Sequence, residues 1–257
     1  MATKIIFLGT GTSQGVPVIG CFCDVCKSSD PRDKRLRASV YIEHNGLRLL
    51  IDAGPDFRQQ LLRAQINNID AILLTHEHRD HIAGLDDVRA FNYINKRAVD
   101  LYAEERVHRA IKHEFDYAFE ENKYPGIPEF SLHTIDEKPF KIGSVEIIPI
   151  RVRHARLPVL GYRIGDIAYI TDANHIEKRE FTKLSGLSLL VINAVRHKPH
   201  ISHFNLGEAV AIAQRVVAKQ TYMTHISHQM GLHAIVEKEL PSGIALAFDR
   251  LTVNGCP

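Results

Sequence analysis

The sequence is poor in the features that mark secreted, membrane or nucleic-acid-binding proteins. It has 4 cysteines, too few for a disulfide scaffold in a chain of 257 residues. Its 32 Lys and Arg residues nearly balance 30 Asp and Glu residues, for a formal net charge of +2, so no broad field favours nucleic acid or membrane. No apolar run approaches a membrane span, and the N-terminal segment lacks a signal peptide's apolar stretch. We therefore expect a cytoplasmic protein.

The rest of the composition is that of a globular domain. Hydrophobic residues make up 45% of the chain and charged residues 24%, and no repeat or linker divides it. We predict one domain over residues 1–257, with a Cys-rich insertion near residues 20–27. Apolar periodicity predicts strands at 5–8, 39–51 (a hairpin around Asn45-Gly46), 72–75, 99–102, 140–142, 145–150, 161–164, 167–171, 189–195, 221–224 and 244–253, and helices at 57–66, 86–94, 106–119, 204–218 and 232–240. Strands and helices interleave in two similar halves, which favours an α/β sandwich with helices outside.

Residues 76–81 are the most informative segment. They read His-Glu-His-Arg-Asp-His and follow an apolar run that predicts a buried strand. Because side chains alternate along an extended backbone, His76 and His78 can address one position while Asp80 and His81 turn toward a second. Imidazole nitrogens and carboxylate oxygens are ligands of zinc and similar cations. The segment therefore predicts a loop that contributes to two metal sites.

Three more residues of ligand type follow predicted strands, namely His154, Asp172 and His225. Functional groups commonly project from such strand-to-loop junctions. Together with residues 76–81, this ordered set resembles the metallo-β-lactamase superfamily, and the resemblance covers nearly the whole chain. It implies a four-layer αβ/βα sandwich fold.

The resemblance also implies how the ligands are shared. One metal would be held by His76, His78 and His154, a second by Asp80, His81 and His225, and both by a bridging Asp172. Asp52 matches the superfamily's aspartate that supports the site from behind. Such a metal pair lowers the pKa of bound water from about 16 to about 7, which suits hydrolysis of phosphodiesters, thioesters or amides. The same nitrogen and oxygen ligands bind both Zn²⁺ and Mn²⁺, so the sequence does not determine which metal is bound.

His203 precedes a predicted helix, in the segment His-Phe-Asn-Leu-Gly-Glu. The phosphodiesterase branch of the superfamily, which includes ribonuclease Z, has a histidine in this setting that protonates or stabilises the leaving oxygen. An alkoxide leaves poorly, so a positioned acid contributes a factor of about 10²–10⁴. His200 is a rival for the same role. We assign catalytic roles to His203 and to the ligand Asp80.

The cysteines are unevenly placed. Cys21, Cys23 and Cys26 form a Cys-x-Cys-x-x-Cys motif, whereas Cys256 stands near the end of the sequence and is not expected to take part. Crowded thiols in a cytosolic chain favour a metal over disulfides. A closed structural zinc site needs four ligands, and we assign His228 as the fourth. Because His228 lies three residues after His225, one loop would touch both metal centres.

The cysteine motif, with the preceding Gly-Thr-Gly-Thr-Ser-Gln-Gly-Val-Pro segment, resembles the PhnP branch of phosphodiesterases. That resemblance implies a small, cyclic, ribose-type phosphodiester as substrate. A ribonuclease Z-like nuclease is the nearest rival, but no basic Gly/Pro-rich arm is present to grip transfer RNA, and the low net charge argues against long RNA. A PqqB-like cofactor-biosynthesis protein and a non-catalytic, metal-dependent interaction module are two further possibilities. The sequence does not determine the oligomeric state, and a homodimer is one possibility.

Overall fold

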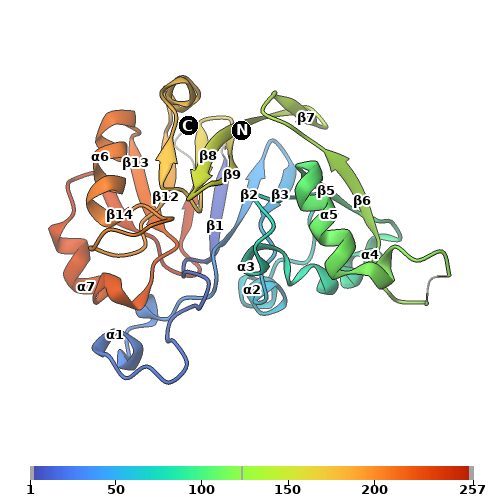
Figure 1. Cartoon of the computed structure of the whole chain (residues 1–257), viewed down its shortest axis with the longest axis horizontal. Helices are drawn as coiled ribbons and strands as arrows, with labels where there is room; N and C mark the ends of the chain where they lie inside the picture. Colours follow the sequence, from blue (N-terminus) through green and yellow to red (C-terminus); the bar gives the residue numbers. More distant parts are fainter. Residues whose placement is uncertain (1–2, 123, 255–257) are drawn as a thin grey trace.

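The computed structural model describes residues 3–122 and 124–254, so Cys256 lies outside the described residues. Two β-sheets pack face to face, and helices cover the outer face of each sheet (Figure 1). The predicted four-layer αβ/βα sandwich is confirmed. Within the described residues, no helix is both long enough and apolar enough to cross a membrane.

The first sheet holds seven strands in the order β15-β1-β2-β3-β4-β5-β6. Their bounds are β1 (Lys4–Gly9), β2 (Ser39–His44), β3 (Leu47–Ile51), β4 (Ala71–Leu73), β5 (Val99–Ala103), β6 (Phe130–Thr134) and β15 (Thr252–Asn254). The β2–β3 hairpin turns at Asn45 and Gly46, which both have positive φ, as a two-residue turn of this sequence requires. From β3 to β6 the strands run parallel, so the loops after β3, β4 and β5 leave the sheet at one edge.

The second sheet has the order β11-β8-β9-β10-β12-β13-β14, with β7 paired to β8. Its strands are β7 (Phe140–Ile142), β8 (Val145–His154), β9 (Leu157–Ile164), β10 (Ile167–Ile170), β11 (His175–Ile176), β12 (Leu189–Asn193), β13 (Gln220–Thr224) and β14 (Ile244–Leu246). Strands β10, β12, β13 and β14 are parallel neighbours. Their C-terminal ends therefore also meet at one edge.

Short α-helices and 3₁₀ turns connect the strands. The helices are α1 (Asp24–Lys27), α2 (Phe57–Ala64), α3 (Arg79–Ile82), α4 (Arg89–Asn95), α5 (Glu105–Glu114), α6 (Leu206–Val216) and α7 (His233–Val236), and the turns are η1 (Pro31–Asp33), η2 (Leu85–Val88), η3 (Asp116–Ala118), η4 (Lys178–Leu184), η5 (His228–Met230) and η6 (Glu237–Glu239). Helix α5 buries Val107 and Ile111, four residues apart on one face. Helix α6 begins with a capping box between Asn205 and Glu208.

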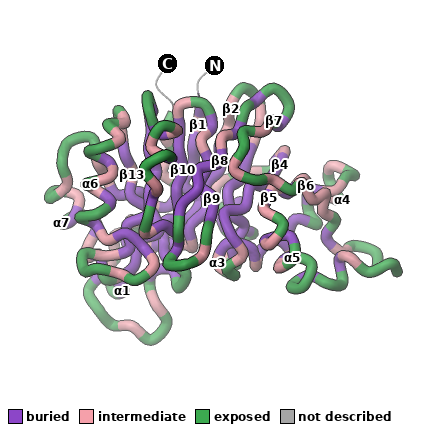
Figure 2. The backbone as a smooth tube through the Cα atoms, turned by 45° about the horizontal axis from the view of Figure 1, so that its top comes forward, coloured by how far each residue is buried: buried purple, intermediate pink, exposed green. Residues whose placement is uncertain are grey.

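Three apolar clusters hold these layers together, and the most buried segments run through the middle of the molecule (Figure 2). One cluster joins the two sheets, with Phe7 and Leu49 on one side and Tyr162 and Val191 on the other. A second lies between the first sheet and helices α2, α4 and α5. The third lies between the second sheet and helices α6 and α7. Both sheets are thus buried on two faces, as apolar parallel strands require.

The structure differs from the sequence predictions in a few elements. The strand predicted at 244–253 is two strands, β14 and β15, which belong to different sheets. The chain turns between them at Asp249 and Arg250, where Asp249 accepts hydrogen bonds from the backbone of Thr10 and Leu36. The helices predicted at 86–94, 106–119 and 232–240 each include a 3₁₀ turn. The sequence analysis did not predict strand β6, although Phe130, Ser131, Leu132 and His133 alternate between apolar and polar; all four side chains are half-buried.

Candidate metal centre

The candidate ligands gather where strand ends of the two sheets meet. Residues 76–81 leave β4 of the first sheet and continue into α3. His154 ends β8, while Asp172 follows β10 and His225 follows β13, all in the second sheet. The fold therefore brings together, from both halves of the chain, every residue that the sequence analysis assigned to the metal pair.

The gathered side chains form two groups with one member in common. The first group is His76, His78, His154 and Asp172, and the second is Asp80, His81, Asp172 and His225. Within each group the ligand atoms lie within 4.8 Å of one another. Asp172 belongs to both groups, which is the geometry of a bridging carboxylate.

Several of these atoms face one another without hydrogen bonding. His81 Nε2 lies 3.3 Å from Asp80 Oδ2 and 3.4 Å from Asp172 Oδ2. Among the described residues, neither this nitrogen nor the two ring nitrogens of His225 have a hydrogen-bond partner of acceptable geometry. Buried polar atoms are rarely left unpaired. Convergent nitrogen and oxygen atoms of this kind fit a divalent cation, which would pair them all.

Hydrogen bonds behind the ligands fix which ring nitrogen faces the centre. His81 Nδ1 donates to Asp52 Oδ2 over 2.7 Å, and His154 Nδ1 donates to the carbonyl oxygen of Ser202 over 2.8 Å. Asp52 is itself held by the backbone N–H and the hydroxyl of Thr75. In both histidines Nε2 is therefore the atom free to bind a cation. The sequence analysis did not identify Thr75 or Ser202, which adjoin predicted site residues.

The carboxylates make the centre attractive to positive charge. Burial lowers the pKa of His225, but Asp172 and Asp80 outweigh it and raise that pKa to about 9. Burial raises the pKa of Asp172, and His225 and His81 bring it well below its usual range. The negative charge of Asp172 is thus buried and that of Asp80 is half-buried. Positive partners, either protons or metal ions, stabilise both charges, and the hydroxyl of Thr171 also donates to Asp172.

The backbone is strained at three positions of this centre. Asp52, Asp172 and His225 have φ values of 63°, 40° and 56°, in the left-handed region that few non-glycine residues occupy. Such conformations cost on the order of 1–3 kcal/mol each and cluster at functional sites. Each of the three residues follows a strand, so the strained turns stand at the strand ends where the candidate ligands meet.

His203 and His200 differ in their relation to the ligands. His203 Nε2 lies 3.2 Å from Asp172 Oδ2, and its ring centroid lies 4.6 Å from that of His154. His200 stands behind it, with its Nδ1 3.1 Å from His203 Nδ1. Asn174, which the sequence analysis missed, joins the surrounding loops by accepting from the N–H of Ala155 and donating to the carbonyl of Ile201. Of the two rivals, His203 is the one at the ligand cluster.

The predicted cysteine site is also assembled. The sulfur atoms of Cys21, Cys23 and Cys26 lie 3.2, 3.4 and 3.6 Å from His228 Nδ1. One ring nitrogen cannot form three hydrogen bonds. Tetrahedral zinc, with Zn–S of about 2.3 Å and Zn–N of about 2.0 Å, would place sulfur and nitrogen about 3.5 Å apart, so the spacing fits a zinc ion. His225 follows β13 and His228 begins η5, so one short segment contributes to both centres.

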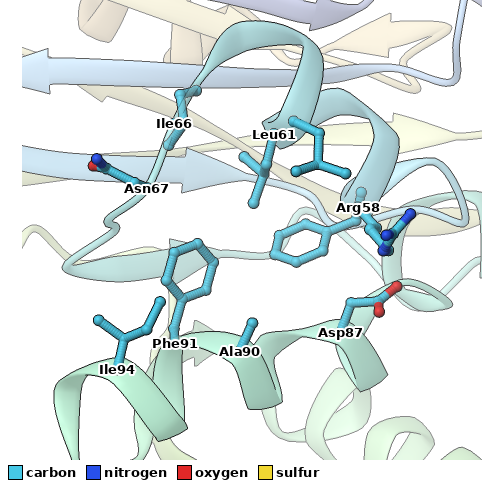
Figure 3. Close-up of a pocket in the computed structure, with 10 residues that line it drawn as sticks. Arg58, Leu61, Ile66, Asn67, Asp87, Ala90, Phe91 and Ile94 are labelled. Carbon is cyan, nitrogen blue, oxygen red and sulfur yellow. The ribbon is translucent and has the colours of Figure 1, made fainter.

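A separate apolar groove lies between α2 and α4 (Figure 3). It has a volume of about 290 Å³, and Phe57, Leu61, Phe91 and Ile94 are among its lining residues. None of the candidate ligands lines it. The groove is therefore distinct from the metal centre.

Known proteins share this fold and much of this sequence. A family model described as a beta-lactamase superfamily domain matches residues 47–226. A crystal structure described as a new diphosphatase from the PhnP family is 44% identical, with a TM-score of 0.92, and the match covers 99% of this chain and 97% of that one. The Zn²⁺-bound PqqB of Methylobacterium extorquens has a TM-score of 0.75 over 97% of this chain and 99% of its own, at 18% identity, which shows the fold alone.

Another relative is described as an octanoyltransferase rather than as a phosphatase. The octanoyltransferase of Porphyromonas gingivalis strain W83 is 42% identical over 251 residues, which is 96% of this chain but 51% of that protein. The chain thus spans about half the length of this relative. The name belongs to a longer protein, and the other half of that protein has no counterpart in the match.

Proposed function

Because this chain belongs to the metallo-β-lactamase superfamily, whose fold and metal-ligand clusters support a metal-dependent hydrolase, we propose that it hydrolyses a small phosphodiester with two divalent cations, Zn²⁺ or Mn²⁺. A third cation, structural Zn²⁺, is held by Cys21, Cys23, Cys26 and His228. The favoured substrate is a cyclic ribose-type phosphate, as in the PhnP branch. The likeness to a PhnP-family diphosphatase supports phosphorus as the atom attacked.

One observation carries the choice of a diester. His203 stands outside both ligand groups. Its Nε2 nevertheless reaches Asp172 Oδ2, an oxygen that also lies 3.9 Å from His76 Nε2 and 3.4 Å from His81 Nε2. Cations held by the two groups would supply a hydroxide at neutral pH and neutralise phosphate charge. His203 is 9% exposed and lies against the ligand cluster, which places it beside a substrate bound there. From there it gives the Nε2 proton to the departing alkoxide oxygen, which a diester requires.

The ligand residues have matching tasks in this scheme. Asp80 lies between His81 and His225, with its Oδ2 3.3 Å from His81 Nε2 and 3.8 Å from His225 Nε2. It would hold, with His81 and His225, a cation that supplies the attacking hydroxide, which is its catalytic contribution. Asp52 keeps the proton of His81 on Nδ1. With its proton on Nδ1, His81 presents an unprotonated Nε2 that can bind a cation.

A second candidate function is cleavage of a diphosphate. It is favoured by one specific finding, the 44% identical relative described as a diphosphatase. The leaving group of an anhydride is a phosphate, which departs with little need of a proton. His203 would then contribute by binding charge rather than by acid catalysis, so the two candidate functions predict different effects of its removal.

The experiment compares kcat/KM on a ribose cyclic phosphate, bis-nitrophenyl phosphate, a nucleoside diphosphate, a precursor transfer RNA, a thioester and a β-lactam, with Zn²⁺ or Mn²⁺ supplied. We expect the cyclic phosphate to be fastest and a chelator to abolish turnover. Elemental analysis should find up to three metals per chain. Faster turnover of the diphosphate would select the second candidate, and faster turnover of RNA, thioester or β-lactam would overturn both.

Replacing His203 tests its proposed role as the general acid. His203→Ala should keep the metal content and lose a factor of about 10²–10⁴ in kcat on the alkyl diester, and much less on the nitrophenyl ester, whose leaving group needs little protonation. His175→Ala, at an exposed histidine of β11, is the matched control. Equal losses on both esters would reject the acid role and favour charge binding.

A further inference from the structure

We propose that Arg106 of helix α5 is a positioning residue for one of the two ligand groups, because it ties together the two chain segments that supply the histidines of that group. The group is His76, His78, His154 and Asp172. Two of its histidines lie on the loop after β4, and the third ends β8. The consequence for turnover rests on the proposed function, whereas the consequence for metal affinity does not.

The first contact of Arg106 is with the loop after β4. The rings of His76 and His78 face the same place, since Nε2 of the first lies 3.0 Å from Nδ1 of the second. Glu77 stands between them, and because side chains alternate along an extended segment, it points the other way. There its Oε2 accepts a hydrogen bond from Arg106 Nη1. The two side chains are only 26% and 21% exposed, so the ion pair is shielded from much of the solvent.

The second contact of Arg106 is with the β8–β9 hairpin. Its Nη2 donates to the carbonyl oxygen of Pro158, which lies in β9, four residues after His154 at the end of β8. Glu104 adds another link, because its Oε2 lies 3.5 Å from Arg106 Nη2 and 3.0 Å from Nη1 of Arg151 in β8. Arg106 therefore joins a loop of the first sheet to a hairpin of the second.

His78 is the ligand that needs this support. The rings of His76, His81 and His154 each have a hydrogen-bond partner outside the ligand groups. Among the described residues, the ring of His78 hydrogen bonds only with His76, and His78 is the one exposed member of the two groups. Its position therefore depends on the backbone of the loop, which Arg106 holds through Glu77.

A second ion pair between the same loop and the same helix provides a control. Arg79 Nη1 donates to Glu114 Oε2 at the C-terminal end of α5. The side chain of Arg79 is 71% exposed, and exposed ion pairs contribute little. Within the part of the chain that the structure describes, Glu114 has no hydrogen bond or ion pair with the β8–β9 hairpin. Loss of this pair should therefore leave the ligand group in place.

The test measures zinc binding by the full-length protein in the absence of substrate. Competition against a chelator of known affinity, followed by elemental analysis, compares the wild type with Arg106→Gln, Glu77→Gln and Glu114→Gln. Loss of a partner behind a ligand typically costs 10-fold to 100-fold in metal affinity, and we expect about 10-fold for one zinc in Arg106→Gln, because its ion pair is partly exposed. Glu77→Gln should lose affinity for the same zinc, and Glu114→Gln should match the wild type.

Two double variants separate positioning from a general effect on folding. Glu77→Gln combined with Arg106→Gln should lose no more zinc affinity than Arg106→Gln alone, because both changes remove one shared contact. In His78→Ala, which loses a ligand of this group, adding Arg106→Gln should not weaken the zinc that is still bound. The thermal midpoint of the metal-free protein should stay close to that of the wild type in Glu77→Gln.

Several results would overturn the proposal. They are an unchanged zinc affinity in Arg106→Gln and Glu77→Gln, an equal loss in Glu114→Gln, additive losses in the first double variant, or a uniform loss for every zinc, which would indicate a purely structural role. With saturating Zn²⁺, turnover of the diester by Arg106→Gln should recover towards the wild-type kcat. If the wild type does not hydrolyse the diester, the proposed function fails, while the zinc affinities still decide the role of Arg106.

Discussion

Replacing Asp52 with Asn should weaken one active-site metal position without unfolding the protein. Asp52 Oδ1 accepts from the N–H of Thr75 over 2.9 Å, and Oδ2 accepts from His81 Nδ1 over 2.7 Å. Because the N–H of Thr75 can only donate, the amide oxygen of Asn must take the Oδ1 place. Its NH₂ group then faces His81 Nδ1. Two donors cannot share that contact, so His81 moves its proton to Nε2, the atom that a cation needs.

The expected loss of metal affinity follows from moving the His81 proton to Nε2. Losing a supporting partner behind a ligand typically costs 10-fold to 100-fold in metal affinity, or about 1.4–2.7 kcal/mol. We expect the upper part of this range, because Asp52→Asn also removes a fully buried negative charge beside His81. The shape and the Thr75 hydrogen bond are kept, so the thermal midpoint without added metal should change little.

The assay is competition against a chelator of known affinity, followed by elemental analysis. The Cys21, Cys23, Cys26 and His228 group is an internal control, because its zinc should stay bound. Asp70→Asn is the matched variant: Asp70 precedes the start of β4, at the end opposite the ligands, and pairs with Arg48. Unchanged metal affinity in Asp52→Asn, or an equal loss in Asp70→Asn, would refute the reasoning.

Three further predictions address zinc, pH and the core. Cys23→Ser should release one zinc and lower the thermal midpoint, since structural zinc can supply on the order of 10 kcal/mol; lost activity with metal and stability unchanged would contradict this. Burial and the charge of Arg35 lower the pKa of His233 from 6.5 to about 4, so its contribution is complete above pH 6.5 and lost as the pH falls toward 4. Urea titrations should show His233→Gln losing less stability over that range than the wild type, by up to about 3 kcal/mol, and parallel curves would refute it. Tyr162→Phe leaves the buried carbonyl of Leu74 without its 2.6 Å hydrogen bond and should cost about 1–3 kcal/mol in urea unfolding; a neutral result would show that water replaces it.

The sequence predicts most of the sandwich because its signals are local. Asn45-Gly46 between two apolar strands indicates a hairpin, and the structure has one. Residues 76–81 follow an apolar run, and this run is the buried strand β4. Such patterns depend on neighbours along the chain, which a sequence displays directly. The order of ligand types at successive strand ends resembles that of the metallo-β-lactamase superfamily, and this resemblance predicted the fold.

The elements that the sequence does not predict depend on contacts between distant segments. Residues 244–253 form an apolar stretch, and only the pairing of β14 with β13 and of β15 with β1 divides it between two sheets. His200 and His203 have similar sequence settings, so their relative depth becomes visible only once Asp172 is placed beside them. Asn174 has no motif, and its importance comes from two loops that the fold brings to it.

The sharing of ligands between the two sheets has a consequence for folding. Each ligand group draws on residues 76–81 from the first half and on His154, Asp172 or His225 from the second. A cation in either group would therefore be captured only after both halves have docked, so metal uptake would be a late event whose rate reports on docking. Because binding stabilises only the docked arrangement, chelation should first loosen the seam between the sheets and leave each sheet's own strand pairing in place. Hydrogen exchange would then rise along that seam before it rises within either sheet.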